Sequence, residues 1–170
     1  MTDTPLSRRA LLVAGAVAVG TAAAGCSDGG DPESGASDLD ESLAVASATQ
    51  YQGPSCACCD EYPPYLDEHL DGELAVEVFD EQQALAERKT ELGVPRDLWS
   101  CHTVVLDGYV FEGHLPVEPI EAFLEAEPDS LGIALPGMPT GSPGMGGEKD
   151  ETWTIYEFSA DGSAEVFTEV

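Results

Sequence analysis

"SCACCDEY", residues 55–62, contains three of the five cysteines of the chain: Cys56, Cys58 and Cys59. Ser55 stands where a helix cap is expected, so the pattern predicts that these cysteines lie in the first turn of a helix. The N–H groups and the dipole at that end of a helix stabilise a thiolate. The cluster is consistent with a disulfide device, a metal site or three small buried side chains.

The segments around the cluster predict an α/β protein. Apolar alternation indicates strands, helical periodicity indicates helices, and an Asp-Gly pair between two strands is a strong hairpin signal. We expect strands at 43–51 and 73–80, helices at 56–72, 81–93 and 117–128, and hairpins at 101–116 and 152–170. The resulting order is β-α-β-α-β-β-α with an added C-terminal β-hairpin. It is the order of a thioredoxin-like fold, in which the first helix begins beside a Cys-x-x-Cys.

Two segments interrupt this pattern. Pro63 and Pro64 lie inside the first predicted helix. A proline in a helix interior costs roughly 3 kcal/mol, so we expect a break or a kink there. Residues 132–150 are rich in glycine, proline and methionine. We expect this segment to be a long loop without secondary structure, which is usual for a lid or a binding loop.

The charge of the chain is strongly acidic. Thirty-three Asp and Glu residues face six Lys and Arg residues, for a formal net charge of −27. The acids are spread along the sequence between apolar positions, as on a solvated surface. This distribution indicates a salt-adapted, halophilic protein whose self-repulsion is screened at high ionic strength. It excludes nucleic acid and anionic lipid surfaces as electrostatic partners.

The N-terminus has the features of an export signal. Arg8 and Arg9 precede an uncharged apolar run at 10–24, which is too short for an ordinary transmembrane helix. Paired arginines in this position are typical of Tat export. The run ends in small residues followed by Cys26, as in a bacterial-type lipoprotein box. We therefore expect cleavage before Cys26 and lipidation of its sulfur, against the alternative of a plain signal peptide with an incidental cysteine.

These features predict the organisation of the whole chain. The segment after the signal contains mostly Gly, Ser, Asp and Pro, which is typical of a flexible tether. We expect a Tat-type lipoprotein signal peptide at 1–25, a tether at 26–42 and a thioredoxin-like metal-binding domain at 43–170. The expected location is the outer side of the cytoplasmic membrane, with lipid as the only membrane contact. This oxidising setting permits disulfides.

The thiols favour a soft metal ion. Thiolates select Cu(I), zinc or iron–sulfur clusters. Zinc prefers a tetrahedral site, and consecutive Cys58 and Cys59 cannot easily both reach one such ion. Copper is therefore the expected cargo and zinc is less favoured. A single structural disulfide would close a very short loop, and three buried cysteines packed only as apolar groups are unusual.

Other soft or titratable side chains are candidates for the same site. Cys101 precedes the third predicted strand, and in a thioredoxin-like fold that position lies beside the start of the first helix. His102 is a further candidate ligand, although alternation along a strand would place its side chain opposite that of Cys101. His114 is expected to be a structural histidine bonded to backbone, although a ligand role stays open, and His69 to be solvated. Met138 and Met145, in the Gly/Pro-rich loop, are candidate ligands because a thioether suits Cu(I). The alternative is that they cover apolar surface.

Three motifs together resemble the CopG-type family of exported copper-resistance proteins, whose members are mostly described only as metal-binding proteins of unknown function. The motifs are "CACC" (56–59), "SCHTVVLDGYVFEGHLP" (100–116) and "LGIALPGMPTGSPGM" (131–145), and the resemblance covers residues 50–147. It implies a thioredoxin-like fold with a multinuclear Cu(I)–thiolate site whose thiols can also exist as disulfides. The matching thiols are Cys56, Cys58, Cys59 and Cys101. The two prolines of the first helix depart from the family pattern.

The expected function is copper binding for sequestration, tolerance or relay, with copper transporters or cuproproteins as partners. The alternative is a thiol–disulfide oxidoreductase that uses the Cys56/Cys59 pair, or a protein that couples copper and thiol oxidation states. Cys58 and Cys101 are surplus to a two-thiol cycle, which favours metal binding over catalysis. A domain held by two disulfides would have no use for the methionine loop.

Overall fold

The computed structural model describes residues 42–170. The predicted signal peptide at 1–25, the predicted lipidation site Cys26 and nearly all of the predicted tether lie outside the described residues. No helix within 42–170 is both long enough and apolar enough to cross a membrane.

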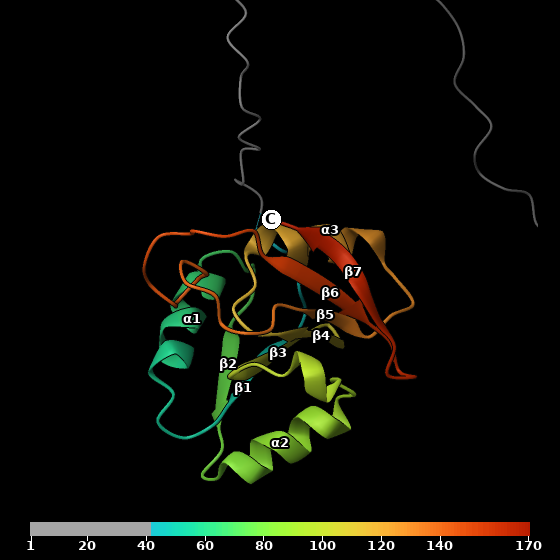
Figure 1. The fold of residues 1–170 in the computed structure, drawn as a ribbon. Coiled ribbons are helices and arrows are strands. Elements are labelled where there is room, and N and C mark those ends of the chain that lie inside the picture. Colours follow the sequence, from blue (N-terminus) through green and yellow to red (C-terminus); the bar gives the residue numbers. More distant parts are fainter. Residues whose placement is uncertain (1–41) are drawn as a thin grey trace, which may run out of the picture. The chain divides into compact units, whose positions relative to one another are not determined.

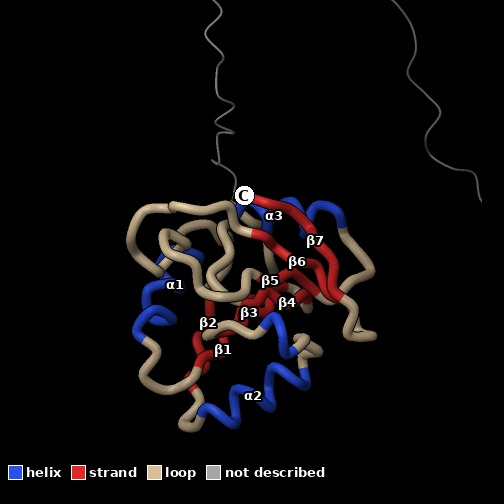
Figure 2. The backbone as a smooth tube through the Cα atoms, viewed as in Figure 1, coloured by secondary structure: helices blue, strands red, loops and turns tan. Residues whose placement is uncertain are grey.

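The described residues form one seven-stranded mixed sheet with three α-helices (Figures 1 and 2). The strands are β1 (Ala48–Gln52), β2 (Leu74–Val78), β3 (His102–Leu106), β4 (Tyr109–Glu112), β5 (Gly132–Ala134), β6 (Thr154–Phe158) and β7 (Ala164–Glu169). The helices are α1 (Ala57–Asp67), α2 (Gln82–Glu91) and α3 (Val117–Ala126), with a 3₁₀ turn at Arg96–Leu98.

The strand order β2-β1-β3-β4-β5-β6-β7 contains the thioredoxin-like core. β1 is parallel to β2 and antiparallel to β3, and β4 is antiparallel to β3. Asp107 and Gly108 both have positive φ, of 49° and 93°, as a tight type I′ hairpin turn requires. The predicted fold is therefore confirmed, and β6 and β7 form the predicted C-terminal hairpin at the far end of the same sheet.

The sheet separates two apolar layers. The larger core lies on the face covered by α1 and α3, and it includes Tyr62 from α1 and Phe123 from α3. The smaller core includes Leu98 after α2, Val110 from β4 and Phe158 from β6. Figure 1 shows α2 on the side of the sheet opposite α1 and α3.

The chain departs from the sequence prediction at β5. Residues 132–134 were expected to be loop, but they pair in parallel with β4 and antiparallel to β6. Gly132 makes this pairing feasible, because a Cβ at this position would lie 1.7 Å from the carbonyl oxygen of Val110. Three residues with a leading glycine form too short a strand to produce a recognisable alternation.

Helix α1 continues through Pro63 and Pro64, so the predicted break is wrong, while the alternative of a kink stays a prediction. Pro63 lacks the N–H that would bond to the carbonyl of Cys59 one turn earlier. That carbonyl instead accepts a 2.9 Å hydrogen bond from Nε2 of Gln50 on β1. The donor that proline removes is thus replaced by a side chain of the neighbouring strand, while Tyr62 and Leu66 bury the inner face of the helix.

Candidate metal centre

The first turn of α1 places three of the candidate cysteines. Cys56 is the N-cap residue, and its carbonyl accepts from the N–H groups of Cys59 at 3.0 Å and Asp60 at 3.2 Å. Ser55, the expected cap, has φ 58° and precedes the N-cap, and no side chain caps this helix. Cys59 is buried, whereas Cys56 and Cys58 are partly exposed. The helix start is therefore lined with sulfur.

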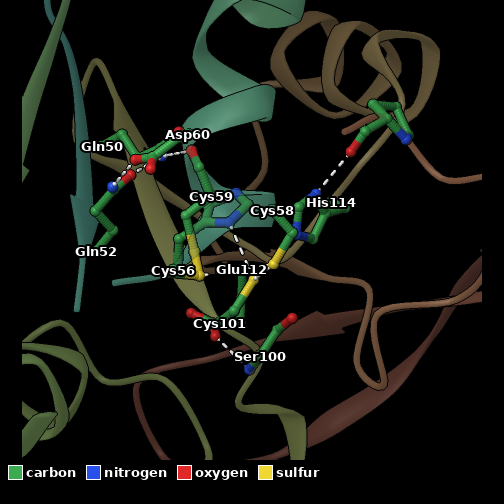
Figure 3. The surroundings of a disulfide bond; sticks show 12 residues. Gln50, Gln52, Cys56, Cys58, Cys59, Asp60, Ser100, Cys101, Glu112 and His114 are labelled. Carbon is green, nitrogen blue, oxygen red and sulfur yellow. Dashed lines mark hydrogen bonds between the residues drawn. A yellow bond between two sulfur atoms is a disulfide. The ribbon is translucent and has the colours of Figure 1, made fainter. Parts of the chain in front are cut away.

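The structure brings four sulfur atoms together, three from this turn and one from the segment before β3 (Figure 3). The Sγ atoms of Cys56 and Cys58 are 3.6 Å apart, and those of Cys58 and Cys101 are 3.9 Å apart. All four Sγ atoms lie within 4.8 Å of one another, which is compatible with metal binding.

Cys56 and Cys59 are joined by a disulfide. The sequence disfavoured a single disulfide because the loop is so short. The helical turn removes this objection, because it holds the two Cα atoms 5.2 Å apart, within the normal range for disulfides. In this oxidised form, Cys58 and Cys101 are the free cysteines of the described residues.

Two imidazoles converge on Cys101. Its Sγ lies 3.4 Å from Nδ1 of His102 and 3.0 Å from Nε2 of His114. The expected separation of Cys101 and His102 by strand alternation is wrong, because β3 begins only at His102. The three side chains form a second group of potential ligand atoms within 4.8 Å, with Cys101 common to both groups.

The place of His114 beside Cys101 was not predicted from the sequence. Its Nδ1 lies 2.6 Å from the carbonyl oxygen of Pro143, in agreement with the expected backbone bond. A carbonyl only accepts, so Nδ1 donates, and the lone pair of Nε2 faces the Cys101 sulfur. The hairpin prediction contained the information needed to place it. Because β4 runs antiparallel to β3, the residues after β4 return to the end of the sheet at which His102 begins β3.

Burial controls the charge of these groups. It raises the pKa of Cys101 to about 12, with a further contribution from the neighbouring Cys58. Burial also lowers the pKa of His102 well below 6.5, assisted by His114 and Lys89, and lowers the pKa of His114. Neutral imidazoles are the form that ligates metals. Buried Nε2 of His102 has no hydrogen-bond partner.

The remaining candidates lie in other surroundings. Met138 is 41% exposed and Met145 is half-buried in the loop whose Pro143 carbonyl bonds to His114. His69 follows α1 and is half-buried rather than solvated, with Nδ1 2.8 Å from the carbonyl oxygen of Tyr65.

A pocket of about 320 Å³ opens beside the sulfur cluster on the α2 side of the sheet. Its lining includes Cys56, Leu85, Lys89, Trp99, Ser100 and Cys101. Two of the four cysteines of the cluster therefore line this pocket.

Fold and site define a class: an α/β, thioredoxin-like protein with a cysteine cluster compatible with metal binding. Residues 98–145 match the family described as "Protein of unknown function, DUF411". Two solved structures are similar, "Copper resistance protein copG- Form 1" and "Form 2". Form 1 is 34% identical, has a TM-score of 0.62, and the match covers 76% of this chain and 98% of that one. Form 2 is 32% identical and has a TM-score of 0.63, and the match covers 76% of this chain and 99% of that one.

This protein belongs to the CopG-type copper-resistance family, as the resemblance of its motifs implied. None of the curated proteins matches the chain.

Proposed function

We propose that this protein binds Cu(I) through the thiolates of Cys56, Cys58, Cys59 and Cys101. The observation that supports this most is the convergence of four sulfurs within 4.8 Å from two separate segments. Cu(I) is a soft ion that prefers sulfur. The names of the two similar solved structures connect those proteins with copper resistance.

The two ligand groups favour more than one copper ion. Cys101 is common to the four-sulfur group and to the group with His102 and His114. A thiolate can bridge two copper ions. Each histidine, in contrast, binds a single ion here, through one ring nitrogen. We therefore assign His102 and His114 as supporting ligands beside Cys101, and leave Met138 and Met145 as candidates supplied by the adjoining loop.

Copper binding is linked to thiol oxidation in this proposal. The disulfide between Cys56 and Cys59 ties up two of the four sulfurs. An external dithiol supplies two electrons and two protons, becomes a disulfide itself, and leaves two free thiols on the protein. Full copper capacity belongs to the reduced form. When an external disulfide reoxidises the pair, it takes up the two electrons and two protons and becomes a dithiol, and part of the bound copper is released.

Sequence features also support a location and a purpose. We propose that the chain is exported by the Tat route, anchored by lipid at Cys26 and exposed on the outer side of the cytoplasmic membrane. There it sequesters copper or relays it to copper transporters or cuproproteins. The pocket beside Cys56 and Cys101 is the route by which copper reaches the sulfurs.

A second function, thiol–disulfide exchange, is favoured by one observation: the Cys56–Cys59 disulfide at the start of α1 in a thioredoxin-like fold. A disulfide exchanger needs a reactive, exposed thiolate. Cys56 is partly exposed, which meets the requirement for access, whereas Cys58 and Cys101 have no part in such a cycle. Copper titration separates the two functions.

The test uses the full chain with Cys26→Ser, because the Cys26 thiol would add to the count. The protein is reduced, freed of reductant under anaerobic conditions and titrated with Cu(I) against a chromophoric chelator in concentrated NaCl. We expect several tightly bound Cu(I) ions and protection of all four thiols from a thiol reagent. Absence of tight copper, together with a disulfide that exchanges readily with dithiols, would establish the second function instead.

Cys58→Ser distinguishes the two functions further. It removes one of the converging sulfurs while the Cys56/Cys59 pair stays intact, so we expect a lower copper stoichiometry with the fold retained. Ala57→Ser, an exposed position in the same turn, is the matched control and should keep the full stoichiometry. Full loading of the Cys58→Ser chain would exclude Cys58 as a ligand.

A further inference from the structure

A buried ion pair contacts the residue that precedes Cys101 of the candidate metal centre. Lys89 of α2 is 2% exposed and Glu112 of β4 is 0% exposed, and the Lys89 ammonium donates to the Glu112 carboxylate. The described residues contain four basic side chains: Arg88, Lys89, Arg96 and Lys149. An acidic chain thus places one of its few cations in the interior.

Stability alone does not account for this pair. Removing two charges from water costs several kcal/mol per ion, and replacement of a buried ion pair by apolar residues is often neutral or stabilising. The contacts of the pair are more informative, because they converge on a single backbone position.

That position is Ser100, the residue before Cys101. Nζ of Lys89 donates to the Ser100 carbonyl at 3.1 Å, and the Ser100 N–H donates to Oε1 of Glu112 at 2.5 Å. The second carboxylate oxygen of Glu112 accepts from the hydroxyl of Thr103 on β3 at 2.6 Å. The pair therefore holds both backbone polar groups of Ser100 and is itself attached to β3. Figure 3 shows Glu112 and Ser100 beside Cys101.

Within the described residues, the sheet makes no backbone hydrogen bonds to Ser100 or Cys101. The β3–β4 ladder begins with the pair Thr103 and Glu112, so Ser100 and Cys101 lie beyond its last rung. Yet the Cys101 sulfur has to lie close to the Cys58 sulfur and to two imidazoles at once. A shift of the Ser100 peptide group would move the Cys101 Cα and all three contacts with it.

We propose that Lys89 and Glu112 are positioning residues that fix the Cys101 sulfur at the point common to the two ligand groups. The proposal depends on the proposed function in one respect, namely that Cys101 binds copper. Groups that orient metal ligands in this way typically change metal affinity about 10- to 100-fold when mutated.

The test compares three full-length chains, all with Cys26→Ser. One is otherwise unchanged. The second combines Lys89→Met with Glu112→Leu, which removes both hydrogen bonds between the pair and Ser100. The third combines Lys89→Met with Glu112→Gln, which removes both charges but keeps one oxygen to accept from the Ser100 N–H. Cooperative urea unfolding shows which chains are folded, and Cu(I) dissociation constants come from competition with a chelator.

We expect Cu(I) affinity to fall about tenfold or more in the Met/Leu chain and to fall less in the Met/Gln chain. In a Cys101→Ser background, the same substitutions should change affinity by no more than about twofold, because a positioning effect needs the group that is positioned. Equal losses in both backgrounds, or no loss with Cys101 present, would overturn the proposal. If the Met/Leu chain does not fold, the Met/Gln chain is compared with the unchanged chain under the same two criteria.

A second measurement does not involve copper. With Cys58→Ser added and the Cys56–Cys59 disulfide intact, Cys101 is the sole free thiol of the chain. Its iodoacetamide alkylation should be faster in the folded Met/Leu or Met/Gln chain, because the released backbone exposes the half-buried sulfur. An unchanged rate refutes positioning even if Cu(I) binds. A faster rate supports positioning even if wild-type protein binds no Cu(I), in which case the proposed function alone fails.

Discussion

Gln50→Leu tests how the cysteine-bearing helix tolerates its prolines. Gln50 is fully buried on β1, and its Nε2 donates to the carbonyl of Cys59 at 2.9 Å and to Oε1 of Gln52 at 2.7 Å. Because Pro63 has no N–H, the Cys59 carbonyl has no helical donor to replace Gln50. Leucine has a similar volume, so the substitution mainly removes donors.

The structure determines the expected magnitude. An unpaired buried carbonyl costs about 1–3 kcal/mol. Loss of the bond to Gln52 adds a further cost, although Gln52 still donates to Asp60 at 2.6 Å. Removal of the Gln50 Oε1, which is buried without a partner, offsets part of it. We therefore expect Gln50→Leu to lower the free energy of unfolding by about 2 kcal/mol.

Pro63→Ala provides the internal control, because alanine restores an N–H directed at the Cys59 carbonyl. The four chains of the double-mutant cycle are unfolded in urea in concentrated NaCl, with the disulfide intact, and followed by circular dichroism. Pro63→Ala should stabilise the Gln50→Leu chain by about 1 kcal/mol more than it stabilises the wild type. An equal gain in both backgrounds would refute the idea that Gln50 replaces the missing helical donor.

Three further predictions concern the fold. Gly132→Ala should destabilise the domain by about 3 kcal/mol or more in urea unfolding, since its Cβ would meet the Val110 carbonyl at 1.7 Å; an effect below about 1 kcal/mol would contradict the β4–β5 pairing. The hydrogen bond that Asp107 accepts from the Ala46 N–H is the main reason why the pKa of Asp107 is lowered below 3.8. Wild type should therefore be more stable than Asp107→Asn near pH 6. This difference in the free energy of unfolding should shrink as the pH falls below 3.8 and through the folded pKa. With a net charge of −27, the urea midpoint should rise as NaCl increases from about 0.1 to 1 M, because the Debye length falls from about 10 to 3 Å, and a salt-independent midpoint would argue against a salt-adapted surface.

Short-range patterns in the sequence were sufficient for most of the architecture. The helix and strand order, the Asp107-Gly108 turn and the cysteines at the start of α1 each depend on residues within a few positions of one another. The thioredoxin-like core follows from this order, because connection rules leave few ways to arrange it. The family was also recognisable from motifs, since each motif occupies a continuous stretch.

Contacts between distant segments decided the rest. The continuity of α1 depends on a side chain from β1, β5 depends on close approach to the Val110 backbone, and the place of His114 beside Cys101 depends on the return of a hairpin. The buried pair of Lys89 and Glu112 also depends on such a contact. In the sequence, Lys89 is an ordinary helix residue and Glu112 an ordinary strand residue, and nothing local connects them. A sequence pattern reports the local preference of a backbone segment. Hydrogen bonds and ligand groups that join side chains far apart in the chain exist only once packing has brought those segments within a few ångströms.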